Sequence, residues 1–403
     1  MVCLFSGGRW PKRLLGVALA LAVLLVGLWV AIHRVPGFGP WLADNARVVA
    51  GPKAVAWVED EAYGIEDWVN RHTRSGEKPE AYWDVPARSS SSAAAKAQKA
   101  DRQARDGSPT VLLRDVGPVH ESFSAPGDGV WLGMPDPRQP NEPVVMAKTL
   151  LHPDRNRSWA VVAVVAVDLR EAELHVVAGL QEPEGRTKEA ASYGRKARIE
   201  PAHLPRLLGA FNGGYKSTHG TYGMKVDGVT LVPPRSLCCA IADYADGHLA
   251  IGSWEKLAPD EPKMSWWRQA PLCMFEDGKP NPVLEMKGFG WGASSVSGTT
   301  VIRRSAIGLD ERGQILFVGI GDHTTASAIA HAMHHAGASN VAQLDVNFSF
   351  PKFVTFAPRD PGSGELVAVP LTEHFEYSED DYVRKPAARD FFYLTRRVEQ
   401  PGS

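Results

Sequence analysis

Arg304, Thr324 and Asp345 carry the side chains with the clearest chemical potential in this sequence. An arginine can grip a phosphate through two parallel hydrogen bonds, and a carboxylate can stabilise or trap a sugar cation. Thr324 and the following Thr325 can cap a helix, whose first N–H groups bind anions well. A phosphate leaving group needs fixed positive charge more than it needs a proton. Together these residues could cleave a sugar from a phosphate.

The elements predicted around these residues place all of them at one edge of a sheet. Apolar runs predict three strands, at Ser305–Leu309, Ile315–Ile320 and Val341–Asp345. A short turn makes the first two antiparallel, and we expect Gly321 to end the second. A helix that runs to about Ala336 and stops at Gly337 makes the second and third strands parallel. Arg304, the helix N-terminus and Asp345 should therefore meet where α/β sheets place ligands.

A second segment is expected to join this edge. Leu207–Phe211 is a predicted strand that leads directly into Asn212, Gly213, Gly214 and Tyr215. Glycines allow backbone N–H groups to come close to a ligand, and the asparagine could hydrogen-bond a sugar hydroxyl or a phosphate. An isolated Asn-Gly-Gly is more often a plain turn.

Four motifs in this order resemble the phosphodiester glycosidase family. The motifs are AFNGGYK, GTYGMKVDGV, RRSAIGL and LDVNFS, and the resemblance covers roughly Val161 to Phe356. It implies hydrolysis of a sugar that is linked to phosphate through its anomeric carbon, commonly by an exported protein. The matching positions are Asn212, Gly213, Gly214, Gly223, Asp227, Gly228, Arg304, Gly308, Asp345 and Ser349.

These observations lead to a set of expected site residues. We expect Asp345, Arg304 and Asn212 to act in catalysis on a sugar phosphate or glycan. The expected substrate-binding residues are Gly213, Gly214, Tyr215, Thr324, Ser349, Asp322 and His323. We expect no cofactor and no metal site.

The chain departs from the family pattern directly after Asp345. Val346, Asn347 and Phe348 stand where the family has glycines, and Phe350 replaces its second serine. Only glycine moves freely into positive φ, so this loop should follow another path or narrow the pocket.

Two functions therefore remain open. One is a hydrolase of glycosyl phosphodiesters, and the other is a non-catalytic protein that binds polysaccharide or a partner. An open pocket between Asp345 and Arg304 favours the enzyme, and a filled pocket favours the binder. The plainest alternative is that these two residues form an ordinary salt bridge at a sheet edge.

Other residues carry weaker signals. Asp322 could simply help to cap the helix. His331 and His335 lie at metal-ligand spacing, but the apolar side of their helix should leave them in solvent. Aromatic residues that could stack on sugars, although plain packing is the more common role, are Trp266, Trp267, Phe289 and Trp291. Lysines that could add positive charge are Lys216, Lys225 and Lys352.

The N-terminus predicts a membrane anchor. Leu14–Ile32 is an uninterrupted apolar run that follows Arg9, Lys12 and Arg13. These basic residues favour a single-pass protein of the bacterial inner membrane with its C-terminal domain in the periplasm. A cleaved signal peptide is the alternative. The net charge of −2 gives no indication of nucleic-acid binding.

The rest of the chain divides by composition. We expect an anchor at 1–35, a helical segment at 36–86, a flexible linker at 87–110 and a folded domain at 111–403. The domain should be α+β, with a largely antiparallel mixed sheet and one strand–helix–strand crossover. Predicted hairpins are Ala160–Val167 with Glu173–Ala178, Tyr222–Val226 with Val229–Val232, and Cys239–Tyr244 with His248–Ile251, and Phe391–Arg396 is a late strand.

Two further features concern packing. An apolar stripe at helical spacing, flanked by Trp57 and Trp68, is formed by Val55, Val58, Ala62, Ile65 and Val69. We expect it to pack on the main domain or on a second copy, which makes residues 54–72 a possible homo-oligomer contact. In an oxidising compartment Cys239 could pair with Cys273, and the alternative is three buried free thiols.

Overall fold

The computed structural model describes residues 10–35, 38–85, 113–286 and 297–398 of the chain. Its contacts divide the chain into two compact units, Met1–Val58 and Glu59–Ser403. The linker predicted at 87–110 lies outside the described residues.

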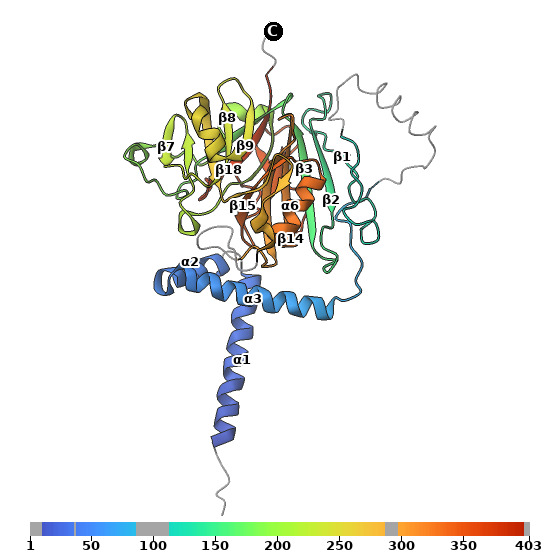
Figure 1. Ribbon diagram of the computed structural model, residues 1–403, viewed down its shortest axis with the longest axis vertical. Coiled ribbons are helices and arrows are strands. Elements are labelled where there is room, and N and C mark those ends of the chain that lie inside the picture. Colours follow the sequence, from blue (N-terminus) through green and yellow to red (C-terminus); the bar gives the residue numbers. More distant parts are fainter. Residues whose placement is uncertain (1–9, 36–37, 86–112, 287–296, 399–403) are drawn as a thin grey trace, which may run out of the picture. The chain divides into compact units, whose positions relative to one another are not determined.

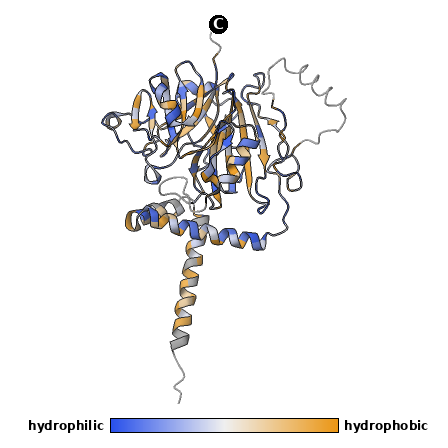
Figure 2. Cartoon of the chain, viewed as in Figure 1, coloured by the Kyte–Doolittle hydropathy of each residue, from blue (hydrophilic) through white to orange (hydrophobic). Residues whose placement is uncertain are grey.

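The first unit is helical. Helix α1 (Trp10–Arg34) is followed by α2 (Phe38–Ala50) and by the start of α3 (Pro52–Thr73). Leu14–Ala31 within α1 is long and apolar enough to cross a membrane, and Figure 2 shows its apolar colouring. The predicted apolar run is therefore helical, with the features of a membrane span or of a signal sequence.

The second unit has the predicted α+β fold of mostly antiparallel sheets (Figure 1). Among the described residues the main sheet has eight strands, in the order β1 (Leu132–Gly133), β2 (Met146–Leu151), β3 (Val161–Asp168), β14 (Ile315–Thr324), β13 (Ile302–Leu309), β15 (Asn340–Val346), β11 (Cys273–Glu276) and β12 (Lys279–Pro280). The "β10 sheet" has the order β7 (Val229–Val232), β6 (Met224–Val226), β10 (Met264–Ala270), β8 (Cys239–Tyr244) and β9 (Leu249–Ser253). The "β5 sheet" has the order β17 (Leu366–Pro370), β16 (Phe353–Pro358), β5 (Leu207–Asn212), β18 (Phe391–Arg396) and β4 (Ala172–Val177).

Helix α6 (Ala326–His335) covers one face of the main sheet and packs against β13, β14 and β15 (Figure 1). Gly308 and Gly319 allow this close approach, because an added Cβ would lie 2.7 Å from the Ala338 Cβ and 2.4 Å from the Met333 Sδ, respectively. The shorter helices are α5 (Trp254–Leu257) and the 3₁₀ helices η1 (Glu189–Ser192), η2 (Pro201–Arg206), η3 (Ser217–His219), η4 (Ala258–Lys263) and η5 (Pro282–Glu285).

The predicted crossover is present, with one difference in its strands. The connection β14–α6–β15 gives two strands of the same direction, but β13 lies between them and is antiparallel to both. The prediction that Gly321 ends β14 is wrong, because Ile302 still pairs with Thr324 beyond it. A bulge at this point gives His323 a φ of 51°.

The hairpin predicted from Ala160–Val167 and Glu173–Ala178 is wrong in its pairing. Strand β3 pairs with β2 and β14 in the main sheet, whereas β4 pairs with β18 in the β5 sheet. All eight residues of β3 are buried, so it requires neighbours on both faces. In β4, buried and half-buried residues alternate, and the two strands separate into different sheets. The hairpins around Asp227 and Asp246 are confirmed.

Helix α3 packs with the face opposite to the one expected. Val58, Ile65 and Val69 belong to the predicted packing stripe, yet they are exposed by 57%, 64% and 41%. Asp60 and Asp67 on the polar face contact the folded unit instead. Val55, at the start of the stripe, is buried, but the two carboxylates rather than the remaining apolar residues of the stripe hold α3 to the folded unit.

A disulfide between Cys239 and Cys273 joins the β10 sheet to the main sheet, and Cys238 is a buried free thiol. The predicted pairing is confirmed. It links residues that are 34 positions apart.

We expect Cys239→Ala with Cys273→Ala to lower the free energy of unfolding by about 3–4 kcal/mol, because closing a loop of this length removes that much entropy from the unfolded chain. Urea unfolding followed by circular dichroism would measure it. Cys238→Ala, which removes only the free thiol, is the matched control. Equal stability of the double variant and the parent would contradict the expectation.

Candidate functional site

The predicted residues meet at one edge of the main sheet. Arg304 on β13 is opposite Gly321 of β14 on one side and Val346 of β15 on the other. Thr325 caps α6 by accepting a hydrogen bond from the N–H of Ala328. The backbone thus places the arginine, the helix N-terminus and the end of β15 together, as the strand order predicts.

The Arg304 guanidinium is fully buried and bonded to backbone carbonyls. Its Nε donates to the Thr324 carbonyl at 3.1 Å, and its Nη2 donates to those of Ser297 and Thr300 at 2.8 Å each. Burial lowers the pKa of Arg304 to about 10, while Tyr215 and Asp60 act in the opposite direction. The donors that were expected to hold a phosphate are therefore occupied by the protein itself.

Asp345 forms its ion pair with Arg389, a residue that sequence reasoning missed. The Asp345 Oδ2 lies 2.7 Å from the Arg389 Nη1, and the aspartate side chain is only 1% exposed. Within the described part of the chain, Asp345 does not form a salt bridge with Arg304. Its Oδ1 is buried and has no hydrogen-bond partner among the described residues.

Asp390, next to Arg389, forms a second buried pair. It receives the Nε of Arg268 from β10 at 2.9 Å and the N–H of Gly214 at 3.0 Å. An added Cβ at Gly213 would lie 2.3 Å from the Asp390 Oδ2. The two glycines therefore make room for this ion pair rather than for a ligand.

Asn212 ties the β5 sheet to the main sheet. Its Nδ2 donates to the Ser305 Oγ at 2.7 Å, and its Oδ1 accepts from the Lys352 N–H at 3.1 Å. The Ser305 hydroxyl in turn donates to the carbonyl of Asp345 at 3.0 Å. The asparagine is fully buried, so these bonds clamp the two sheets together.

Of the remaining predicted residues, Thr324 has a buried hydroxyl without a hydrogen-bond partner among the described residues, and the others are engaged within the protein. The Tyr215 hydroxyl accepts from Gln343, and burial raises its pKa. Ser349 donates to the Asn347 Oδ1 from both its N–H and its hydroxyl. Asp322 lies 3.3 Å from Arg303 and 3.3 Å from His323.

Two phenylalanines of the divergent loop cover arginines at this edge. The Phe350 ring centroid is 3.9 Å from the Arg389 guanidinium carbon, and the Phe348 ring centroid is 4.8 Å from that of Arg303. The Arg303 Nη1 also donates to the Phe348 carbonyl at 2.7 Å. Phe348 and Phe350, from the loop that follows Asp345, therefore cover the guanidinium groups of two arginines at this edge.

Helix α3 covers the same edge. Tyr63 packs against a cluster formed by Tyr215, Tyr222, Cys238, Ile302 and Val346. Asp60 accepts hydrogen bonds from the Ser297 N–H at 2.9 Å and the Thr300 hydroxyl at 2.6 Å. The sheet edge is thus closed by a helix as well as by the loop.

The weaker candidates have structural partners. His331 and His335 bond to the carbonyls of Ser327 and Gly117, and the described residues contain no group of three metal-ligating side chains. Lys352 pairs with Asp381 at 2.9 Å. Trp267 is fully buried. The predictions for Phe289 and Trp291 lie outside the described residues.

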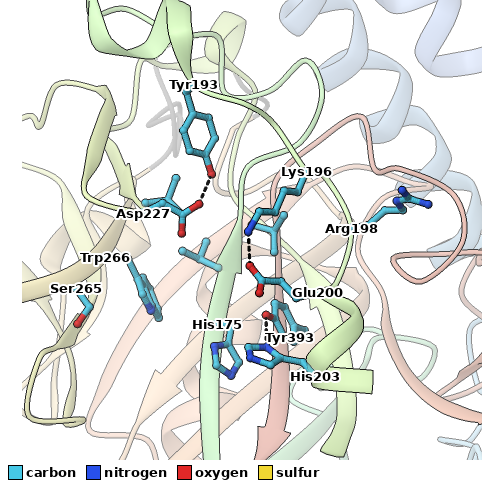
Figure 3. A pocket seen from close by; sticks show the side chains of 13 residues that line it. His175, Tyr193, Lys196, Arg198, Glu200, His203, Asp227, Ser265, Trp266 and Tyr393 are labelled. Carbon is cyan, nitrogen blue, oxygen red and sulfur yellow. Dashed lines mark hydrogen bonds and ion pairs between the residues drawn. The ribbon is translucent and has the colours of Figure 1, made fainter. Parts of the chain in front are cut away.

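An open cavity of about 340 Å³ lies elsewhere, between β4, β10 and the segment 193–203 (Figure 3). Its apolar wall contains Val177, Val226, Trp266 and the ring of Tyr393. Its polar residues are His175, Tyr193, Lys196, Arg198, Glu200, His203, Asp227 and Ser265.

Stacked rings form one side of this cavity. The ring of His175 lies 4.6 Å from that of Tyr393 and 4.8 Å from that of His203, measured between centroids. The His203 Nδ1 and the Tyr393 hydroxyl share a hydrogen bond of 2.7 Å, and the His175 Nε2 bonds to the Thr395 hydroxyl at 2.8 Å. Burial, followed by the effect of His203, lowers the pKa of His175 to about 3. The ring is therefore neutral near pH 7.

The cavity is lined by two cations, Lys196 and Arg198, and two anions, Glu200 and Asp227. Lys196 lies 2.5 Å from Glu200, and the Tyr193 hydroxyl donates to Asp227 at 2.7 Å (Figure 3). Burial and this bond raise the pKa of Tyr193. The cavity thus offers hydrogen-bonding groups and ring faces without a strong net charge.

Sequence reasoning found only Trp266 and Asp227 of this cavity. Its key rings come from positions 175, 203 and 393, which no local spacing connects. The one usable signal was the alternation in Ala172–Val177, which places His175 and Val177 on the same face of a strand.

Comparisons with known proteins do not assign a family. No family model matches the chain, and no curated protein matches it. A solved structure of a hypothetical protein from Synechocystis is similar with a TM-score of 0.37 and 10% identity, and it covers 64% of this chain and 63% of its own. This chain therefore spans less than two thirds of that protein. A structure from Burkholderia pseudomallei, provisionally described as an exported protein, has a TM-score of 0.23 and 11% identity, and it covers 59% of this chain and 74% of its own.

The buried pair predicts a stability effect at Asp345. Asp345→Asn leaves Arg389 buried without a counter-charge, so we expect the free energy of unfolding to fall by about 3–5 kcal/mol. Adding Arg389→Met should recover part of the loss, because no unpaired charge remains. Denaturant unfolding measures the free energy of unfolding of the single and the double variant. Asp260→Asn, which breaks an exposed pair with Lys263, is the control. An unaltered transition for Asp345→Asn would show that the pair does not hold the fold.

The neutral His175 predicts a dependence of stability on pH. An unfolded histidine binds a proton below about pH 6.5, whereas the folded ring takes one only near pH 3. The unfolded state therefore binds more protons between these values, and stability should fall as the pH decreases through this window, by at most about 1.4 kcal/mol per pH unit. We expect His175→Gln to show a shallower slope in thermal unfolding from pH 7 to 4. The exposed His331→Gln is the control. Equal pH dependence of the unfolding temperature in the parent and in His175→Gln would contradict the low pKa of this ring.

Proposed function

We propose that this chain is a membrane-anchored exported protein that binds a neutral saccharide in the cavity between β4 and β10. We further propose that Arg304 and Asp345 serve its stability rather than the cleavage of a sugar phosphate. The observation that carries the proposal is the contrast between the two sites. The predicted catalytic side chains are buried and bonded within the protein, whereas the cavity is open and has mixed polar and aromatic walls.

The closed sheet edge argues against phosphate chemistry in this state of the protein. A phosphate needs donors that are free to receive it, but those of Arg304 are bonded to three carbonyls. Asp345 must contact the anomeric carbon to stabilise a cation, and Phe350, α3 and Arg389 surround this region of the fold. The binder hypothesis requires none of these groups to be accessible.

The lining of the cavity favours a neutral ligand with hydroxyl groups. Lys196 and Glu200 pair with each other, and the two other formal charges in the lining, Arg198 and Asp227, are opposite in sign, so the cavity offers a charged ligand no excess of counter-charge. Trp266 and Tyr393 are largely buried but line the cavity, and the parts of their rings that border it can contact the apolar C–H surface of a sugar. His203, Ser265 and the hydroxyl of Tyr193 can exchange hydrogen bonds with its hydroxyls.

The proposed location is the bacterial inner membrane, with the folded unit in the periplasm. The basic residues before α1 favour retention of the N-terminus in the cytoplasm. The Cys239–Cys273 disulfide fits an oxidising compartment. In this arrangement, α1 is a single-pass anchor that keeps the folded unit tethered to the inner membrane.

A hydrolase of glycosyl phosphodiesters is the second candidate. It is favoured by the Asp345 Oδ1, a buried carboxylate oxygen without a hydrogen-bond partner among the described residues. Such an atom is costly unless something else satisfies it. The four motifs that resemble the phosphodiester glycosidases are consistent with a substrate that contacts this oxygen.

The binding proposal is tested with the full-length protein in phosphatidylcholine nanodiscs. Calorimetric titration with neutral oligosaccharides of hexoses and N-acetylhexosamines should detect binding. Tyr193→Phe removes one hydroxyl and keeps the ring, and Trp266→Ala removes a wall. We expect each to weaken binding at least tenfold, which corresponds to about 1.4 kcal/mol. Lys256→Ala, which breaks an exposed pair outside the cavity, should bind like the parent.

A parallel assay with sugar 1-phosphate diesters separates the two candidate functions. Release of sugar by the parent protein, and its loss in a folded preparation of Asp345→Asn, would overturn the binding proposal in favour of the hydrolase. Failure of every neutral oligosaccharide to bind would also refute it.

A further inference from the structure

Helix α3 attaches to the folded unit through its polar face. Both carboxylate oxygens of Asp67 accept hydrogen bonds from Arg157, at 2.6 and 2.7 Å. About two turns earlier, Asp60 accepts hydrogen bonds from the N–H of Ser297 and the hydroxyl of Thr300. These contacts lie at spacings that define one side of a helix. They fix the rotation of the helix about its own axis.

The opposite side of α3 is an exposed apolar face, which we call the α3 face. It consists of Val58, Ala62, Ile65, Trp68 and Val69. The exposed fractions are 64% for Ile65, 55% for Trp68 and 41% for Val69. An amphipathic helix of a water-soluble domain normally buries such a face. A continuous exposed apolar surface instead marks an interaction site.

We propose that the α3 face lies in the headgroup region of the same membrane that α1 enters. Helices of this kind bury their apolar side about 5–10 Å into the boundary between headgroups and acyl chains. Trp68 on this face and Trp57 beside it are both exposed, and tryptophan is enriched at this depth of a bilayer. The α3 face is thus a second membrane contact, additional to the spanning helix.

The short connection to α1 supports a lipid partner. Helix α1 ends at Arg34 and α3 begins at Pro52, and α2 occupies most of the residues between them. Because this connection is short, α3 must stay near the surface of a membrane that holds α1. In α2, Trp41, Val48 and Val49 are also exposed, by 59%, 87% and 89%. Interfacial contact therefore accounts for exposed apolar residues in both helices.

A second copy of the chain fits the α3 face less well. Glu61 is exposed and, at 100° per residue, lies on this face between Ile65 and Trp57. In a two-fold contact, the same patch meets itself, so two Glu61 carboxylates would approach each other. The few side chains of the face also offer less area than a stable dimer requires. A lipid headgroup layer leaves Glu61 in contact with water.

The proposal orients the folded unit on the bilayer. Thr300, which α3 contacts, precedes β13, and the turn at Arg312 follows it. Strand β13 has eight residues, so its two ends are about 26 Å apart at roughly 3.3 Å per residue. Arg312 should therefore stand well above the headgroups while Ile65 lies among them.

Spin labels at these two positions test the proposal in full-length protein in phosphatidylcholine nanodiscs. Labels are attached to Ile65→Cys or, as the matched control, to Arg312→Cys, with Cys3→Ser in both. Cys238 is buried and the other two cysteines are joined. Collisions with oxygen, which concentrates in lipid, are compared with collisions with a water-soluble nickel chelate. We expect oxygen to dominate at Ile65 and the nickel chelate to dominate at Arg312.

Two results would overturn the proposal. Nickel accessibility at Ile65 equal to that at Arg312 would place the α3 face in water. Low accessibility to both reagents, together with dipolar broadening of the Ile65 spectrum, would place a second copy of the chain on it. A label at Val69→Cys repeats the measurement one turn along the same face, so that a local disturbance at Ile65 does not decide the outcome.

Discussion

The adjacent residues Arg389 and Asp390 form the interaction on which the rest of the structure depends. Arg389 pairs with Asp345 at the end of β15, and Asp390 pairs with Arg268 on β10. Because these residues directly precede β18, the two ion pairs join all three sheets at one point. Removing such charges from water costs several kcal/mol for each ion, so every partner must be in place. The fold is therefore most constrained at the point where the sequence predicts catalysis.

This constraint explains why residue types that suit catalysis do not form an open site. Arg304 and Asn212 are saturated by the backbone and by neighbouring strands, and Gly213 and Gly214 make room for the Arg268–Asp390 pair. Aromatic rings in place of glycines complete the closure. The proposed binding takes place instead in the cavity between β4 and β10, which histidines and tyrosines line.

Charge and hydrogen-bond pairing also decides how helix α3 packs. A carboxylate that finds an arginine or a hydroxyl fixes α3 to the folded unit, and its apolar residues are left for another environment. Attachment through Asp60 and Asp67 also covers the sheet edge. The helix that would hold the protein at a bilayer is thus the one that closes the predicted site.

The sequence alone determined the local structure of this protein. Periodicity and turn residues located the apolar N-terminal helix, the β6–β7 and β8–β9 hairpins and the cap at Thr325, because these features depend on neighbours along the chain. It also placed Arg304 and Asp345 at the same sheet edge, since the directions of successive strands follow from their connectivity. Only the tertiary structure decided that β3 and β4 belong to different sheets and that Asp345 faces Arg389. It also decided that His175, His203 and Tyr393 meet around a cavity. These outcomes rest on contacts between residues far apart in the sequence, where burial and charge pairing select one partner from many compatible ones.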